Sequence, residues 1–270
     1  MTTYIHESTQ TSLDSLSVAQ PHALLVTGPD GVGLNTIARI FTKAVEGVPL
    51  PVRPAEGSVT VETVRSLYDM TKTGSTQRRC IILDAADTMS HQAQNALLKL
   101  LEEPVDQTTF ILLSHIPENL LPTIRSRTQR LDVRPITQAM TEALLDALKV
   151  RDKTQRTQLT FIAAGLPSLL TKLARDSEAF EARVAIVRDA RTYVQGRRYE
   201  RLLVAQRYAD SRDKAVLLIQ DALKILELSV SKGSDPRIIR QLEHLMTVHE
   251  RLAINGNVRL QLTSGVLYFV

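Results

Sequence analysis

Two glycines separated by five positions give the first indication of chemistry in this sequence. Gly28 and Gly33 match the start of the phosphate-binding pattern G-x-x-x-x-G-K-[S/T], with Gly31 between them. In that pattern the backbone amides cradle phosphates, the lysine reaches the outer phosphates and the hydroxyl ligates Mg²⁺. Here the lysine position is Leu34 and the hydroxyl position is Asn35. We therefore predict a loop that keeps its anion-binding backbone but lacks the side-chain cation that a triphosphate requires.

The residues on either side of this loop are expected to hold it between a strand and a helix. Residues 22–27 are apolar and β-prone, and after Thr36 residues 37–44 continue at helical spacing. That is the strand–loop–helix context in which the phosphate-binding pattern has meaning. For the loop taken alone, an ordinary strand-to-helix turn remains the alternative interpretation.

A carboxylate follows the next predicted buried strand. A basic pair leads into four apolar residues and then Asp84, which is typical of a central parallel strand that ends in a Mg²⁺-directed carboxylate. An active nucleotide hydrolase needs a second acid next to it to polarise the attacking water, and that position is Ala85. An aspartate at a strand end is also a common helix cap, so Asp84 alone decides little.

Hydroxyl and guanidinium groups come from the following segments. Residues 109–114 are predicted to be a third buried strand that places Ser114 at the carboxyl edge of the sheet, where open α/β sheets bind ligands. Residues 120–128 are predicted to form a short helical turn that carries Arg125 and Arg127. From the residue types alone, these arginines are interpreted as solvated surface charges.

Composition limits the possible classes of protein. The chain has 270 residues, of which 43% are hydrophobic, enough for a sizeable core and two or three domains. The net charge of +4 permits contact with nucleic acid without arguing for it. A single cysteine, Cys80, excludes an intrachain disulfide framework and a Cys-rich zinc module. No apolar run has the length of a signal-peptide core or a membrane span, so we expect a soluble, cytoplasmic protein with no membrane partner.

The pattern along the chain predicts an α/β region followed by helices. Residues 12–18 are predicted to be a short helix, residues 48–54 to be extended because of their prolines, and residues 129–135 to be strand. Helices are predicted over 138–149 and 153–164, and residues 177–270 are helical in pattern almost throughout. The leucines of this last region have the spacing of a helical-bundle core.

Taken together, these stretches resemble the delta-prime family of clamp-loader subunits of bacterial DNA polymerase III, which are AAA+ proteins. The resemblance lies in residues 22–33, in Asn95 to Pro104, in Leu121 to Thr128 and, more distantly, in Leu252 to Leu262. The third stretch resembles the Ser-Arg-Cys signature of that family, with Thr128 in place of the cysteine. The resemblance runs the length of the chain; it is specific up to residue 135 and weak between 176 and 245.

The resemblance implies a fold of three domains: an AAA+ P-loop-type α/β domain over 1–135, a helical lid over 136–175 and a helical collar over 176–270. It also implies a place in a five-membered ring with motor ATPase subunits and a clamp-opening delta subunit, which loads the sliding clamp onto primer-template DNA. Ser126 and Arg127 match the signature whose arginine points at the nucleotide of the neighbouring subunit. Arg127 is thus expected to act as an arginine finger in trans.

Four departures from the family pattern lie in the chain's own nucleotide site. Leu34, Asn35 and Ala85 replace groups that contact phosphate, Mg²⁺ and water, and the lid arginine of active relatives is replaced by Leu169. The site so predicted is a degenerate one, and it comprises Gly28, Gly31, Gly33, Leu34, Asn35, Thr36 and Asp84. We expect it to hold no ATP cofactor. Several relatives bind zinc through four cysteines that this chain lacks, so no metal is predicted. These losses predict a subunit that assists hydrolysis without performing it.

Two other functions remain as alternatives. The first is an AAA+ ATPase with a non-standard but active site, in which Asn35 ligates Mg²⁺ and Arg39 or Lys43 contacts phosphate; these basic residues lie one or two turns into the helix, facing away from the loop. The second is a nucleic-acid-binding module that acts alone. Its basic residues form adjacent pairs such as Arg78 with Arg79, not an extended stripe, and aromatic residues for base stacking are scarce.

Overall fold

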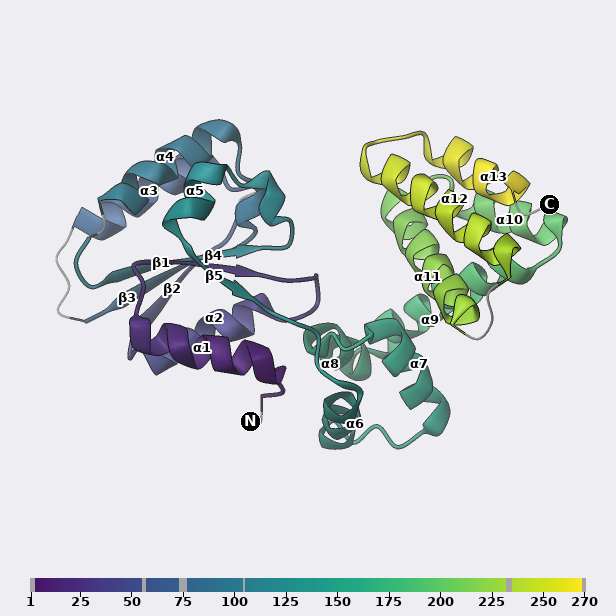
Figure 1. Ribbon diagram of the computed structural model, residues 1–270, viewed down its shortest axis with the longest axis horizontal. Coiled ribbons are helices and arrows are strands. Elements are labelled where there is room, and N and C mark those ends of the chain that lie inside the picture. The colour runs from purple at the N-terminus through teal and green to yellow at the C-terminus, as the bar shows by residue number, and fades with distance from the viewer. Residues whose placement is uncertain (1–2, 55–56, 73–76, 104, 232–234, 269–270) are drawn as a thin grey trace. The chain divides into compact units, whose positions relative to one another are not determined.

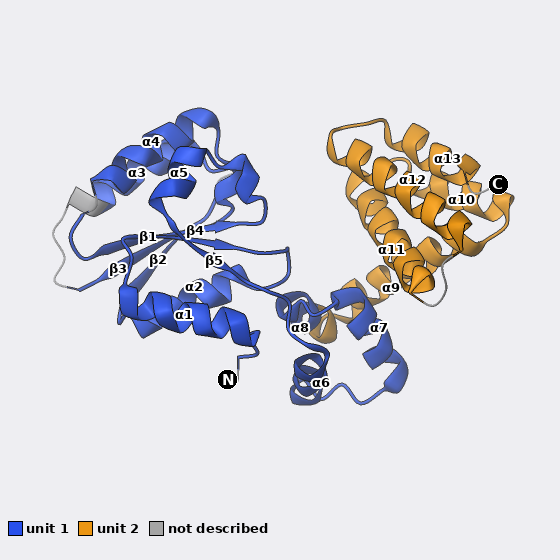
Figure 2. Cartoon of the chain, viewed as in Figure 1, with its two compact units in different colours: residues 1–172 blue, residues 173–270 orange. Residues whose placement is uncertain are grey.

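The chain forms two compact units, residues 1–172 and residues 173–270 (Figure 2). The structure is a computed structural model and describes residues 3–54, 57–72, 77–103, 105–231 and 235–268. Pro104, the last residue of one stretch that carries the family resemblance, lies outside these ranges. The predicted boundaries at 135 and 175 divide the chain more finely than the two units do, and they stay a prediction.

Unit 1 is organised by a parallel sheet of five strands in the order β2-β3-β4-β1-β5. The strands are β1 (Ala23–Thr27), β2 (Val48–Val52), β3 (Arg79–Leu83), β4 (Thr108–Ser114) and β5 (Gln129–Asp132). β1 lies between β4 and β5, so the chain leaves β1 toward one edge of the sheet and returns on its other side. Open α/β sheets bind ligands at such a switch point, and here the loop after β1 is the glycine loop.

Helices cover both faces of this sheet (Figure 1). One face carries α1 (Glu7–Ala19) and α2 (Leu34–Ala44); the other carries α3 (Val61–Lys72), α4 (His91–Glu102) and α5 (Pro122–Arg127). Successive residues of β1 point to opposite faces, so Leu24 and Val26 join one buried cluster while Ala23 and Leu25 join the other. Burial on both sides favours the apolar runs at the centres of β1 and β4, which is why both strands are recognisable in the sequence.

β2 fits the sequence-based expectation, whereas the ends of α1 and β5 differ from it. β2 confirms an extended segment with Pro49 and Pro51, and it pairs with β3 alone, at the edge of the sheet. The predicted helix 12–18 is too short, because α1 extends back to a cap at His6 and its buried Thr9 donates to the carbonyl of Asp132. The predicted strand 129–135 is too long: β5 stops where its partner β1 gives way to the glycine loop.

The end of unit 1 is helical, with α6 (Gln138–Ala147), α7 (Lys153–Ala163) and α8 (Pro167–Arg175). The hydroxyl of Thr137 and the carboxylate of Asp152 cap the first two helices by accepting from backbone N–H groups three residues on. This confirms the predicted helices apart from their last residues. The connection into α8 passes through Gly165, whose φ of +80° lies in the left-handed region.

Unit 2 is a bundle of helices, as predicted. Its described elements are α9 (Ser177–Gln195), α10 (Arg198–Tyr208), α11 (Arg212–Val230), α12 (Pro236–Ala253) and α13 (Val258–Tyr268). α11 packs against α9 and α12, and α13 packs against α10 and α12. The buried Tyr193 of α9 donates its hydroxyl to the carbonyl of Leu262, 2.6 Å away, beside Gly265, where any side chain would collide with the tyrosine.

The bundle also contains a buried ion pair. Both guanidinium nitrogens of Arg183 in α9 donate to the carboxylate of Asp221 in α11, which is fully buried. One turn further along α11, burial lowers the pKa of Lys224. Around Asp221 the bundle therefore depends on charge pairing as well as on apolar packing.

Within the described ranges, every helix is too short or too polar to cross a lipid bilayer. A search of the same residues finds no group of three or more His, Cys, Asp or Glu side chains placed to hold a metal ion.

Candidate functional site

The glycine loop connects β1 to α2 with two residues in the left-handed region. Gly31 has φ +83° and Gly33 has φ +95°, conformations that glycine adopts at little cost. The strand end below the loop is tied across the sheet, because Thr27 donates its hydroxyl to Asp132 at 2.5 Å. Burial pushes the pKa of Asp132 upward, but hydrogen bonds from Thr27 and Arg130 outweigh burial and lower it. Asp132 therefore anchors the strand end as a carboxylate.

Leu34 begins α2, in the position where the phosphate-binding pattern has lysine. Its side chain is 4% exposed and belongs to the apolar cluster under the sheet, together with Ile37 and Ala38. Asn35 accepts a hydrogen bond from the Nε of Arg39 through its Oδ1 at 3.0 Å, and Thr36 is exposed. In the first turn of α2, the Leu34 side chain is therefore buried in the core, and the side-chain amide of Asn35 is paired with Arg39.

The last helix of unit 1 lies against the same loop. The carbonyl of Gly31 accepts from the backbone N–H groups of Ser168 and Leu169, at 2.9 Å and 3.1 Å. These donors belong to the first turn of α8, whose N–H groups have no partner within the helix. A Cβ on Gly31 would lie 2.8 Å from the Cβ of Leu169, which is closer than real side chains approach. The loop and α8 thus fit together only because residue 31 is glycine.

We expect Gly31→Ala to separate α8 from the loop and to lower the stability of unit 1 by about 1–3 kcal/mol more than backbone strain alone would, the usual cost of forcing an extra methyl group into a packed contact. Gly57→Ala is the matched control, since Gly57 has a similar φ of +82° but nothing lies within 4 Å of the place that a Cβ would take. Urea unfolding and amide exchange in α8 measure the difference between the variants. Equal effects of the two substitutions would mean that the contact with α8 contributes nothing.

His115, which no pattern in the sequence singles out, contacts the loop from the opposite side. Its ring Nδ1 lies 2.8 Å from the carbonyl oxygen of Gly28, and its Nε2 lies 3.8 Å from the Oδ1 of Asp30. Its backbone N–H donates to the carboxylate of Asp87 at 3.4 Å; Asp87 belongs to the short helix η1 (Ala86–Thr88). The signal that could have found it is its place directly after β4, at the edge of the sheet where β1 ends.

The carboxyl edge of the sheet also carries Asp84 and Ser114. Asp84 follows β3 and accepts from the N–H of Ala85 at 3.0 Å, while Ala85 itself has a positive φ of 50°. Ser114 ends β4 fully buried, and its Oγ has no hydrogen-bond partner in the part of the chain that the structure describes. Within the described residues, the contacts of Asp84 are with Ala85 and with the carbonyl of Val52 in β2, so a shared site with the glycine loop stays a prediction.

Arg127 lies at the end of α5, on the surface. Its side chain is 37% exposed, with Nη2 at 2.8 Å from the Oε1 of Glu102 in α4 and Nη1 donating to the carbonyl of Thr123 at 3.1 Å. The neighbouring Ser126 donates its hydroxyl to the same carbonyl. An exposed ion pair of this kind contributes about 0–1 kcal/mol, so it holds the guanidinium only weakly in place.

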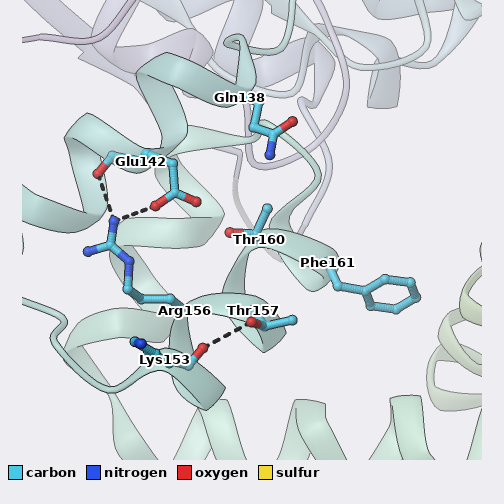
Figure 3. Close-up of a pocket in the computed structure, with 7 residues that line it drawn as sticks. All are labelled: Gln138, Glu142, Lys153, Arg156, Thr157, Thr160 and Phe161. Atoms are coloured by element: carbon cyan, nitrogen blue, oxygen red, sulfur yellow. Dashed lines mark hydrogen bonds and ion pairs between the residues drawn. The ribbon is translucent and has the colours of Figure 1, made fainter.

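A separate hollow of about 490 Å³ lies between α6 and α7 (Figure 3). Arg156 lines it, but its guanidinium is already paired with the carboxylates of Glu142 and Asp146. Figure 3 draws the side chains of Glu142 and Arg156 in contact with each other, with Phe161 directed away from them. None of the lining residues belongs to the glycine loop, so this hollow is distinct from the predicted nucleotide site.

Comparison with known proteins finds similarity to subunits of DNA polymerase III. The family described as "DNA polymerase III, delta subunit" matches residues 50–137. The DNA polymerase III subunit delta' of Pseudomonas aeruginosa is 30% identical over 181 residues, covering 56% of this chain and 55% of the relative. These matches bear out the resemblance to a delta-prime-like clamp-loader subunit. The chain is also 29% identical over 246 residues to the DNA polymerase III subunit tau of Bacillus subtilis, covering 80% of the chain and 43% of the relative. It thus spans about half the length of these curated relatives.

A solved structure confirms the AAA+ fold of this chain. A DNA polymerase III gamma subunit-related protein of Thermotoga maritima superposes with a TM-score of 0.58 over 95% of this chain and 98% of the other, at 18% identity. At that identity the likeness speaks for the fold alone. The resemblance and the fold class predicted from the sequence are both confirmed.

Proposed function

We propose that this clamp-loader subunit does not hydrolyse ATP and acts as a stator in a ring with motor ATPase subunits and a clamp-opening delta subunit. The observation that carries the proposal is the burial of Leu34, because the helix that would present a phosphate-binding lysine instead directs an apolar side chain into the core. The ring as a whole would place the sliding clamp on primer-template DNA. The chain's own pocket is proposed to work without ATP or metal.

Several features support this assignment. Asn35 is engaged by Arg39, so the amide in the Mg²⁺ position already has a partner. Ala85 offers no group to polarise water, and Leu169 brings an apolar side chain to the glycine loop where active relatives carry an arginine. Arg127, in contrast, keeps an exposed guanidinium. We propose that it stabilises the charge developing on the nucleotide of a neighbouring subunit.

The full chain with Mg·ATP is expected to release phosphate at the background rate, while a motor subunit of the same organism, assayed in parallel, turns over normally. The reason is that both the phosphate-binding cation and the water-activating acid are absent. Steady-state phosphate release, with and without primed DNA, measures this.

Any residual turnover is assigned with Asn35→Ala and Arg39→Ala. If the chain itself were an ATPase with non-standard groups, these variants would abolish the signal. A contaminating ATPase would be unaffected by them. Tight binding of Mg·ATP with turnover comparable to the motor subunit would overturn the proposal in favour of that alternative.

A further inference from the structure

The sheet register places His115 beside the glycine loop. β4 and β1 pair in parallel with Ser114 opposite Thr27, so the next residue of each strand, His115 and Gly28, emerge side by side. The imidazole Nδ1 lies 2.8 Å from the Gly28 carbonyl, a normal hydrogen-bond distance. The backbone of His115 is itself held by Asp87. The position of His115 beside Gly28 is therefore fixed both by the pairing of β4 with β1 and by Asp87 of η1.

We propose that His115 is a positioning residue that holds the glycine loop in its ordered conformation without a bound anion. A carbonyl oxygen can only accept, so Nδ1 carries the proton and the ring is a donor to Gly28. On the other side of the loop, the N–H groups of Ser168 and Leu169 hold the Gly31 carbonyl. Donors from the protein thus bind the carbonyl oxygens of both Gly28 and Gly31, so the glycine loop does not need a phosphate to be ordered.

The charge state of the ring leaves this attachment intact. With Nδ1 protonated, Nε2 is free to accept a second proton, and the bond to Gly28 is the same in the neutral and the charged imidazole. The charged groups that face the ring are Asp30, 3.8 Å from Nε2 and 96% exposed, and Asp87 on its backbone side. Protonation adds an attraction to Asp30 that solvent largely screens. The loop is therefore expected to stay attached whether the imidazole is neutral or charged.

The test is amide exchange of Gly28 and residues 30–33 in the full chain, comparing three substitutions. His115→Asn keeps a donor near the place of Nδ1, whereas His115→Gln offers a donor one bond further out and His115→Ala offers none. We expect exchange to rise roughly two- to tenfold in the Ala and Gln variants, as for the loss of one hydrogen bond, and to stay near wild type in the Asn variant. Equal exchange in Asn and Gln, or no change in Ala, would overturn the proposal.

Two controls keep the result independent of folding and of the proposed stator role. Amides of the bundle in unit 2 provide an internal reference, and if His115→Ala does not fold, the Asn and Gln pair still decides. Asp30→Asn is expected to leave exchange of the loop unchanged at neutral pH, and a rise equal to that of His115→Ala would assign the anchor to Asp30 instead. The role of His115 rests on the proposed function, but an experiment can contradict it separately. ATP turnover by the chain would overturn the stator role, whereas only loop exchange tests His115.

Discussion

In a ring reconstituted with motor and clamp-opening subunits, Arg127→Ala is expected to leave assembly intact and to slow ATP hydrolysis at the one site that the arginine faces. Loss of an arginine finger costs on the order of 10³ or more in the rate at its own site. Clamp-stimulated ATP turnover by the whole ring should fall by the fraction of the total turnover that this site contributes. The side chain is free to act because only an exposed pair with Glu102 and a backbone carbonyl hold it.

The chain supplies its own controls for this experiment. Arg125 lies in the same helix, exposed, and its guanidinium makes no hydrogen bond or ion pair within the described residues. Arg125→Ala should leave turnover unchanged, and an equal loss in both variants would point to general surface charge instead. Arg127→Lys keeps the positive charge but loses the bidentate hydrogen-bond geometry of the guanidinium. We therefore expect a hydrolysis rate between those of the wild type and of Arg127→Ala. Glu102→Gln releases Arg127 and should not reduce turnover.

The largest effect on stability is expected in unit 2. Arg183→Ala removes the partner of a fully buried carboxylate, since Asp221 is 0% exposed and Arg183 only 12%. Breaking a buried ion pair by removing one side costs about 3–5 kcal/mol, because the remaining charge is left without compensation. Urea unfolding, followed by amide exchange in α9 and α11, measures the loss.

Two further variants separate this cause from a general loss of packing. Replacing both Arg183 and Asp221 by leucine removes both charges together and should recover most of the stability. Arg207→Ala is the matched single change: Arg207 pairs with the buried Asp189 but is 60% exposed, and Asp189 keeps a hydrogen bond from Tyr208. It should cost clearly less than Arg183→Ala. A double leucine variant as unstable as Arg183→Ala would contradict the electrostatic explanation.

Much of the fold follows from local patterns in the sequence. β1, β4 and the helix after the glycine loop are predictable because buried strands and amphipathic helices carry their own periodicity. The predicted ends of α1 and β5 are wrong because they depend on contacts between distant segments, such as the bond from Thr9 to the carbonyl of Asp132. Local propensity contains no information about such partners.

The candidate site is predictable in its residue types but not in its contacts. Spacing and family resemblance are enough to select the glycines, Leu34 and Arg127. They do not select His115, because its role depends on the register between β4 and β1, strands whose contacting residues lie 87 positions apart. Likewise, the sequence does not reveal that Glu102 holds Arg127, since the two belong to different helices that meet only in the folded chain.

The prolines of β2 have a consequence for how this protein can associate. The N–H of Val48 points inward to the carbonyl of Arg78, so the N–H groups of alternate residues point away from the sheet, and there Pro49 and Pro51 have none. A strand from another chain would meet carbonyl acceptors along the outer edge of β2 but no N–H donors at Pro49 and Pro51. It could not form a regular hydrogen-bond ladder with β2. Addition of a strand at this edge of the sheet is thereby blocked, both in a crowded cell and in a misfolded pair of copies. Contacts that other subunits make at the β2 edge must then be made by side chains.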